Sequence, residues 1–180
     1  MRVVLDACVL FPTVLREILL GVAARGLYTP LWSERILEEW ARATRRLGPA
    51  AEVQARAEVA AVKAAFPKAM VLPQPGLESR LHLPDEADIH VLAAAIGSHA
   101  DAILTFNAAD FPRGVLAAEG LARRDPDGFL WELWSSHPET VATIVREVHA
   151  KAEAIAGAPL SLRALLKRAR LPRLAKALQT

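Results

Sequence analysis

Two acidic residues stand just beyond apolar, strand-like runs, at positions where an α/β protein can do chemistry. Asp6 directly follows RVVL, and Asp110 lies in TFNAADF, five residues after Thr105 at the end of the run DAILT. In open parallel sheets, ligands bind beyond the carboxyl ends of the strands. If both runs are parallel strands, Asp6 and Asp110 leave the sheet at the same edge. For Asp6, capping of the turn into the next helix is the alternative role.

Further acids lie on two expected helices, where their neighbours separate solvent-facing carboxylates from inward ones. In SERILEEWARATRR, Glu38 has charged residues at helical spacing, whereas Glu39 lies on the apolar stripe that continues to Leu47. In LPDEADIHVLAAA, Asp85 suits the cap of the helix, whereas Asp88 shares a face with the apolar residues three, four and seven positions later. The pattern therefore favours Glu39 and Asp88 as the inward carboxylates.

These carboxylates, if they converge in one crevice, predict a bound cation. Carboxylates that lie close together repel one another and raise each other's pKa unless a cation lies among them. Oxygen ligands alone suit a hard divalent ion, Mg²⁺ or Mn²⁺, whose coordination is completed by water and substrate phosphates. Such an ion activates water and stabilises the leaving oxygen of a phosphodiester. The chemistry indicated is that of a metal-dependent nuclease.

The elements that must position these acids alternate between strands and helices. Strands are expected at 2–5, 70–72, 101–105 and 122–124, an extended segment at YTPLW, and helices at about 12–25, 33–47, 50–65, 86–99 and 113–119. This alternation predicts an α/β fold with a central parallel sheet and helices on both faces. After the turn signature DPDG, helices alone are expected, at about 129–136, 138–156 and 160–178. The predicted layout is an α/β domain at 1–124 and a helical C-terminal extension at 125–180.

Composition is that of a soluble globular protein. The 180 residues are 53% hydrophobic, which is ample for a core. No apolar run reaches the roughly 18 to 20 residues of a membrane span, and the N-terminal stretch has an Asp inside its apolar run, unlike a signal peptide. Cys8 is the single cysteine, so a reducing compartment fits. We expect a cytoplasmic protein without a membrane partner.

Basic residues are concentrated in two places, although the net charge is only +2. One cluster comprises Arg35, Arg42, Arg45 and Arg46, and residues 157–180 contain six Lys or Arg and no acid. Basic faces suit a polyanion such as RNA, and solvated helix faces are the alternative. Side chains expected to contact RNA are Arg42, Arg45, Arg46, Arg163, Lys167, Arg168 and Arg170. The tryptophans, Trp32, Trp40, Trp131 and Trp134, are interpreted as core or interface anchors rather than base-stacking platforms.

Four blocks in this order, VVLDACVLFP, ILEEW, PDEADIHVLAAA and ADAILTFNAADFP, resemble a PIN-domain ribonuclease. The resemblance covers roughly residues 1–124 and is strongest to the VapC-type toxins of bacterial toxin–antitoxin pairs, within a subset that carries a helical C-terminal extension. It implies the three-layer α/β/α PIN fold, RNA cleavage that depends on Mg²⁺ or Mn²⁺, frequent homodimers, and inhibition by a cognate antitoxin protein. A tRNA or ribosomal RNA is the target that the family suggests.

The resemblance also assigns roles to individual residues of this chain. The catalytic and metal-binding acids fall on Asp6, Glu39, Asp88 and Asp110, and the supporting residues on Asp85, Thr105 and Asn107. Many PIN nucleases have an Asp where this chain has Asn107, which places more weight on Asp110 and leaves open whether one or two metal ions bind.

Other phosphate chemistries fail on spacing, but a second function of the same fold stays open. Cys8 stands where a haloacid-type phosphatase needs a second acid, no glycine-rich phosphate loop is present, and the five histidines lack zinc-type spacing. The histidines are interpreted as surface or hydrogen-bonded residues. The alternative to a nuclease is a PIN-like module that binds RNA or a protein partner without cutting.

Overall fold

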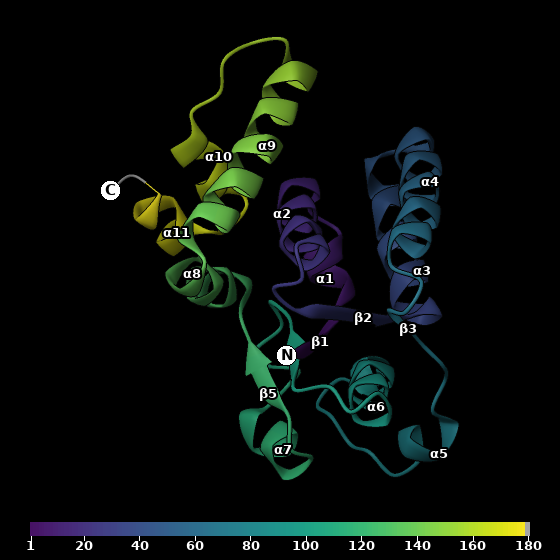
Figure 1. Ribbon diagram of the computed structural model, residues 1–180. Coiled ribbons are helices and arrows are strands. Elements are labelled where there is room, and N and C mark those ends of the chain that lie inside the picture. The colour runs from purple at the N-terminus through teal and green to yellow at the C-terminus, as the bar shows by residue number, and fades with distance from the viewer. Residues whose placement is uncertain (179–180) are drawn as a thin grey trace. The chain divides into compact units, whose positions relative to one another are not determined.

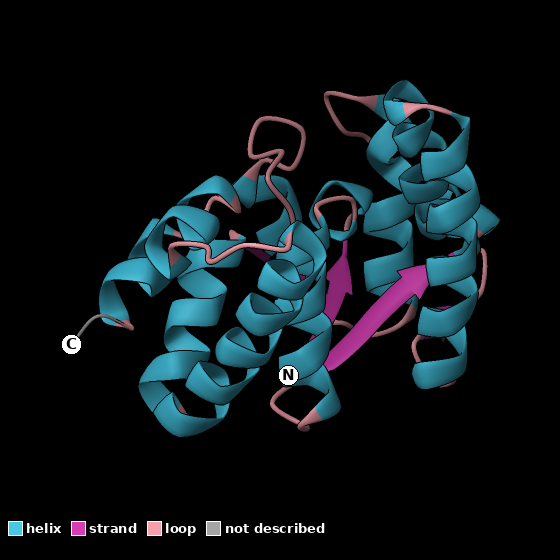
Figure 2. Cartoon of the chain, turned by 90° about the horizontal axis from the view of Figure 1, so that it is seen from above, coloured by secondary structure: helices cyan, strands magenta, loops and turns pink. Residues whose placement is uncertain are grey.

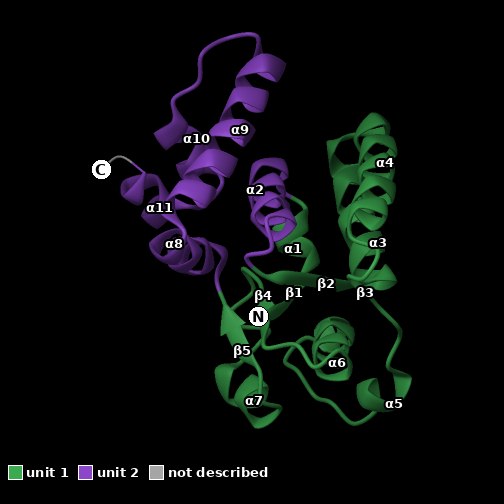
Figure 3. Cartoon of the chain, in the orientation of Figure 1, with its two compact units in different colours: residues 1–11, 28–124 green, residues 12–27, 125–180 purple. Residues whose placement is uncertain are grey.

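The computed structural model describes residues 1–178, which form two compact units (Figures 1 and 3). Unit 1 comprises residues 1–11 and 28–124, and unit 2 comprises residues 12–27 and 125 onwards. The predicted boundary at 124 thus coincides with a change of unit, whereas the helix near residue 20 is grouped with the C-terminal helices. Whether residues 1–124 fold as a domain of their own stays a prediction.

Unit 1 is built on a five-stranded sheet in the order β3-β2-β1-β4-β5, in which every neighbouring pair is parallel. The strands are β1 (Arg2–Leu5), β2 (Thr29–Ser33), β3 (Met70–Val71), β4 (Ala102–Leu104) and β5 (Ala122–Arg124). Val3, Val4 and Leu5 of the central strand are fully buried, as expected for a parallel strand covered on both faces.

Helices flank this sheet in unit 1. They are α1 (Ala7–Leu10), α3 (Glu34–Ala43), α4 (Pro49–Ala65), α5 (Pro75–Glu78), α6 (Ile89–Gly97) and α7 (Arg113–Ala118), with 3₁₀ turns η1 (Thr44–Leu47) and η2 (Glu86–Asp88). In Figure 1, α1 and α3 lie on one side of the sheet and α6 on the other. The predicted α/β class with a central parallel sheet, flanking helices and a helical C-terminal region is therefore confirmed.

The local signals for the helix starts are satisfied by hydrogen bonds. Ser33 Oγ accepts from the backbone N–H of Ile36 at 3.2 Å, and Asp85 Oδ1 accepts from the backbone N–H of Ala87 at 2.9 Å. Both side chains satisfy a donor that the first helical turn leaves without a partner. Asp85 therefore has the capping role that its position predicted.

Unit 2 consists of helices, and beyond Arg124 the described residues contain no strand (Figure 2). Its elements are α2 (Thr13–Ala24), α8 (Pro126–Ser136), α9 (Pro138–Ala156), α10 (Leu162–Arg168) and α11 (Pro172–Ala177). Gly21 of α2 packs so closely on α9 that a Cβ there would lie 2.6 Å from Ile144 Cγ2. No helix within residues 1–178 combines the length and the apolar character needed to cross a membrane.

Three expectations about the helices were wrong in detail. The segment 86–99 begins as the 3₁₀ turn η2, and the short helices α1 and α5 were missed. The single helix expected at 160–178 is two helices, because Arg170 adopts a left-handed φ of 62° and Pro172 lacks the N–H that a continuing helix needs. The break lets α11 turn back and pack on α8.

Candidate active site

Asp6 is held at the carboxyl end of β1 by the residue that follows the neighbouring strand. Asp6 is 4% exposed, and its Oδ2 accepts a 2.7 Å hydrogen bond from Thr105 Oγ1. Thr105 Oγ1 in turn accepts from the backbone N–H of Asn107 at 3.0 Å. Parallel pairing of β1 with β4 brings Asp6 and Thr105 to the same sheet edge, so these three residues form one short hydrogen-bonded chain.

Cys8 is a second donor to the same oxygen of Asp6, and the sequence did not indicate this role. Its Sγ lies 3.1 Å from Asp6 Oδ2 and donates to it, while the backbone N–H of Phe106 donates to Sγ at 3.3 Å. Burial and the nearby Asp6 carboxylate raise the pKa of the Cys8 thiol to about 12. A thiol with this pKa is protonated at neutral pH, so Cys8 is a neutral donor rather than a nucleophile.

Asp88 is the carboxyl group that the charges of the other predicted acids reach. It is half-buried at the end of η2, next to the start of α6. Burial, followed by the charges of Asp6, Asp85, Asp110 and Glu39, raises the pKa of Asp88 to about 6. Acids that are far apart in sequence therefore lie within electrostatic range of one carboxyl group, as the strand ends and the helix faces predicted.

Glu39 projects toward α6, where it meets a buried histidine. Its Oε1 lies 2.8 Å from His90 Nε2 and 3.4 Å from Arg35 Nε. The His90 side chain is 3% exposed, and within residues 1–178 neither of its ring nitrogens has a partner in hydrogen-bonding geometry. The 2.8 Å approach is thus a close polar contact without hydrogen-bond alignment. The interpretation of His90 as a surface or hydrogen-bonded residue was wrong.

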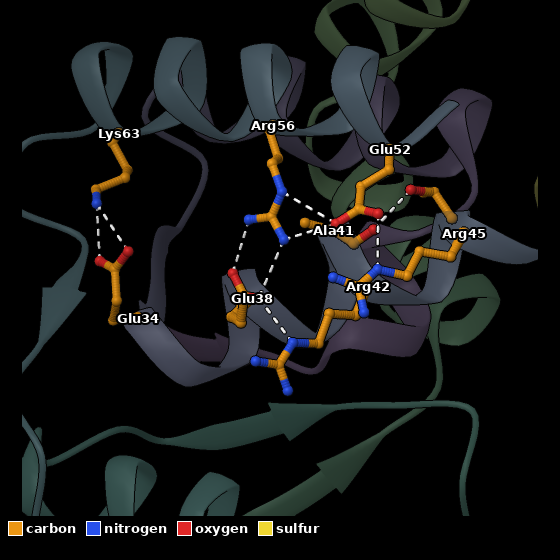
Figure 4. A network of polar contacts seen from close by, with 9 residues as sticks. Glu34, Glu38, Ala41, Arg42, Arg45, Glu52, Arg56 and Lys63 are labelled. Carbon is orange, nitrogen blue, oxygen red and sulfur yellow. Dashed lines mark hydrogen bonds and ion pairs between the residues drawn. The ribbon is translucent and has the colours of Figure 1, made fainter. Parts of the chain in front are cut away.

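Glu38 and Glu39 differ in their partners and not in their exposure, since both side chains are 36% exposed. Glu38 accepts from Arg42 at 2.7 Å and from Arg56 of α4 at 2.9 Å. Hydrogen bonds from Arg56 and Arg42 lower the pKa of Glu38 to about 2. Glu38 is therefore part of an ion-pair network between α3 and α4 (Figure 4), whereas Glu39 contacts His90 of α6.

Asp110 and Asn107 lie in the loop after β4, and both are half-buried. The backbone N–H of Asp110 donates to the carbonyl of Asn107 at 3.2 Å. This turn brings Asp110 within range of Asp88. It also places the amide of Asn107 one residue beyond Phe106, whose backbone contacts Cys8.

The donor set fits a hard divalent cation by its chemistry. Asp6, Glu39, Asp88 and Asp110 offer only carboxylate oxygens, the ligands that such a cation prefers. Burial and, after it, the charges of the other acids raise the pKa of Asp88. Across residues 1–178, however, no three Asp, Glu, His or Cys side chains converge closely enough to form a ready-made metal cluster. The residues that would hold a cation are thus near one another without being in ligand geometry.

The two basic clusters differ in whether their charges are paired. Arg42 is bound to Glu38, and Arg45 Nε donates to Glu52 at 2.7 Å (Figure 4). The guanidinium of Arg46 lies 4.5 Å from the ring centre of Phe11. In contrast, within the described chain no carboxylate pairs with Arg163, Lys167 or Arg168 of α10. Positive charge in unit 2 is therefore more available to a polyanion.

The fold and this edge define an α/β protein with a parallel sheet and an acidic site beyond the carboxyl ends of its central strands. The model of the PIN domain family matches residues 2–109, and the chain belongs to the PIN-domain family, whose fold is generally that of a nuclease. The match includes Asp6, Glu39 and Asp88 and ends one residue before Asp110. Searches of curated proteins and of solved structures found no match.

Proposed function

We propose that this PIN-domain protein is a metal-dependent endoribonuclease that hydrolyses RNA phosphodiester bonds. The proposal rests on the buried Asp6, which Thr105 and Cys8 hold at the carboxyl end of β1 in a chain of the PIN-domain family. In support, burial and then the charges of four other carboxylates raise the pKa of the half-buried Asp88 to about 6. Such an arrangement is unfavourable for folding unless a cation or a proton compensates it. Charge repulsion of this kind is typical of sites whose function requires it.

Asp6, Glu39, Asp88 and Asp110 are the residues that would hold Mg²⁺ or Mn²⁺. When bound, the ion would supply positive charge for the phosphodiester and its departing oxygen, and would make water more acidic. The protein's own contributions follow from its contacts. Thr105 and Cys8 fix the orientation of Asp6. Asp6 or Asp110 would accept the proton of the water that attacks phosphorus in line with the leaving oxygen.

As the finer part of the proposal, the protein is the toxin of a VapC-type toxin–antitoxin pair. The support is the order of the motif blocks and the acids near Asp88. We expect growth inhibition through cleavage of a tRNA or ribosomal RNA in the cytoplasm, a homodimer, and a cognate antitoxin protein that blocks the site. Induced expression should arrest growth, and Asp6→Asn should abolish the arrest while the protein level is unchanged.

Cleavage of total cellular RNA by the purified protein tests the proposal directly. Reactions with Mg²⁺, Mn²⁺ or EDTA should give discrete fragments only with the metals, and Asp6→Asn and Asp88→Asn should give none. The chain offers a matched pair of controls, because Glu39→Gln should lose cleavage and the adjacent, equally exposed Glu38→Gln should keep it. Cleavage by Asp6→Asn at the parent rate would refute the metal site.

A PIN-like module that binds without cutting is the alternative, and the same experiment separates it. Retention of RNA by a folded protein that produces no fragments with either metal would establish that alternative. Equal loss of cleavage in Glu38→Gln and Glu39→Gln would instead show that helix α3 tolerates no charge change, and would remove the specific role of Glu39.

A further inference from the structure

A cavity of about 540 Å³ lies within unit 2, between helices α8 and α11. The described residues that line it are Trp131 and Trp134 of α8 and Arg173, Lys176 and Ala177 of α11. The tryptophans are three residues apart, as are Arg173 and Lys176, so each helix presents one pair on one face. The lining of the cavity therefore combines an aromatic pair from α8 with a cationic pair from α11.

The two helices that form the cavity are fixed to each other by a buried carboxylate. Asp127 of α8 is 8% exposed, and its oxygens accept from the backbone N–H groups of Arg173 at 2.9 Å and Leu174 at 3.1 Å. Phe129 and Leu174 are buried beside this contact. Asp127 thus bonds to the backbone at the start of α11 and not to the side chains of Arg173 and Lys176, which stay available.

The aromatic side chains of the cavity are not ordinary core residues. Trp131 is 41% exposed and Trp134 is half-buried, whereas Trp32 and Trp40 are 0% and 1% exposed. Trp32 and Trp40 are therefore core residues, as expected, whereas Trp131 lies outside the core and its interpretation as an interface anchor stays a prediction. An exposed indole next to a cavity is available to stack on a flat ring.

The positive charge beside the cavity indicates which kind of aromatic ligand it would bind. Residues 157–180 contain six Lys or Arg and no acid, and no carboxylate of the described chain pairs with the side chains of Arg173 or Lys176. Single-stranded nucleic acid combines the two features that the cavity matches, a base with a π face and a phosphate beside it. An acidic peptide would satisfy the cations but would leave the paired indoles unexplained.

We propose that the cavity between α8 and α11 binds single-stranded RNA, with a base stacked on Trp131 or Trp134 and its phosphate on Arg173 and Lys176. The identity of the nucleic acid as RNA rests on the proposed nuclease function. Unit 2 thereby adds a substrate-binding site distinct from the acidic edge in unit 1.

Intrinsic tryptophan fluorescence of the full-length protein tests this site. A ten-residue single-stranded RNA of mixed A and U is titrated in EDTA, so that no cleavage occurs. Trp32 and Trp40 are buried in the core, so a change in emission reports Trp131 and Trp134. We expect quenching in the parent. Because the Trp131→Ala, Trp134→Ala double variant lacks the reporting side chains, its affinity and that of the parent are compared by filter binding of the same RNA, and the variant should bind about tenfold to a hundredfold more weakly, the range for loss of a stacked base.

The cationic pair is tested by the salt dependence of the same binding. For single strands, log K falls as log salt rises, and each lost phosphate contact makes this negative slope less steep by about 0.7. Arg173→Gln and Lys176→Gln should each make the slope less steep by roughly that amount. The matched control is Lys68→Gln, which removes an exposed cation of unit 1 and should leave the slope unchanged.

Parent-like affinity in a folded Trp131→Ala, Trp134→Ala double variant would overturn the site, as would a slope that Lys176→Gln does not change. If the parent co-purifies with an acidic protein that the cavity variants lose, while the variants bind RNA like the parent, the cavity binds a protein partner. That result would also overturn the proposed RNA site. Failure of the nuclease is distinguishable, because a protein that binds the RNA through Trp134 in EDTA but cuts none with Mg²⁺ or Mn²⁺ supports the cavity alone. A protein that cuts RNA, with cavity variants that bind like the parent, supports the nuclease alone.

Discussion

Thr105 Oγ1 donates a 2.7 Å hydrogen bond to Asp6 Oδ2, and the two residues each follow directly on one of two neighbouring parallel strands. The bond links residues 99 positions apart in sequence, and it fixes the carboxylate on which the proposed site depends. A hydrogen bond to a charged group contributes roughly 1.5–3 kcal/mol, so its loss should be measurable in both stability and activity.

Thr105→Val removes this donor and keeps the branched shape. We expect the free energy of unfolding to fall by about 1–3 kcal/mol and RNA cleavage to fall about tenfold or more, because Asp6 loses its fixed orientation. Urea unfolding and cleavage rates measure the two effects. Thr105→Ser keeps the hydroxyl and serves as the control, and equal cleavage by the Val variant and the parent would contradict a positioning role.

Asp88→Asn should stabilise the metal-free protein at neutral pH. Because the folded pKa of about 6 exceeds the ordinary value of 3.8, the native state keeps a proton that the unfolded chain has already lost. The free energy of unfolding should therefore decrease as pH rises from about 4 to 6. At pH 7 the gain from Asp88→Asn should be at most about 1 kcal/mol, since solvent screens a half-buried group.

Urea unfolding in EDTA at pH 4 and at pH 7 measures this effect. The free energies of unfolding of the parent and of Asp88→Asn should differ less at pH 4 than at pH 7. Glu38→Gln is the control of opposite sign, because the pKa of Glu38 is lowered to about 2 by Arg56 and Arg42. Its ion pairs are present above about pH 4.5 and are lost as pH falls toward 2, so this variant should be less stable than the parent at pH 7. An Asp88→Asn protein that is also less stable at pH 7 would contradict the repulsion.

Mn²⁺ or Mg²⁺ should raise the melting temperature of the parent, because a ligand that binds only the folded state stabilises it by mass action. The proposed ligand acids predict a smaller shift in Asp6→Asn and Asp88→Asn. A thermal-shift titration with each metal measures this without reference to cleavage. Equal shifts in Asp88→Asn and Glu38→Gln would place the bound metal elsewhere.

Cationic side chains that are paired with a carboxylate should contribute less to RNA affinity than those that are not. Lys167→Gln with Arg168→Gln should weaken RNA binding and reduce its salt dependence, since these cations have no carboxylate partner in the described chain. Arg42→Gln with Arg45→Gln removes the same charge from side chains bound to Glu38 and Glu52, and should have the smaller effect. Filter binding at several salt concentrations compares the two double variants, and the reverse order would reject this ranking.

Much of the fold follows from local patterns in the sequence. The apolar run RVVL predicted the central strand, Ser33 predicted the start of α3, and Pro49 and Gly48 bracket the start of α4. These signals act over a few residues, since burial, capping and the restricted φ of proline are local. The break at Arg170 was not predicted, although Pro172, which lacks the N–H that a continuing helix needs, was a local signal for it.

The acids of the candidate site were also chosen from the sequence alone. A strand end locates Asp6, and apolar neighbours favoured Glu39 and Asp88. The expected contrast in exposure between Glu39 and Glu38 was wrong, because both side chains are 36% exposed and only their partners differ. The fold brings these acids within electrostatic range of Asp88, while their roles as metal ligands stay a prediction. Sequence patterns can locate such acids because strand ends and helix faces are periodic features of a short segment.

Tertiary structure alone decided which side chains meet. The contact of His90 with Glu39, the hydrogen bond from Thr105 to Asp6, and the pairing of Arg56 with Glu38 join residues that are far apart in the sequence, and no local spacing favours these partners over others. The same is true of the cavity that Trp131 and Lys176 both line. The sequence by itself determined the types of element and the acids at their ends. Distances between elements arise from the packing of the whole chain, and these distances decided which charges are compensated and which stay available for a ligand.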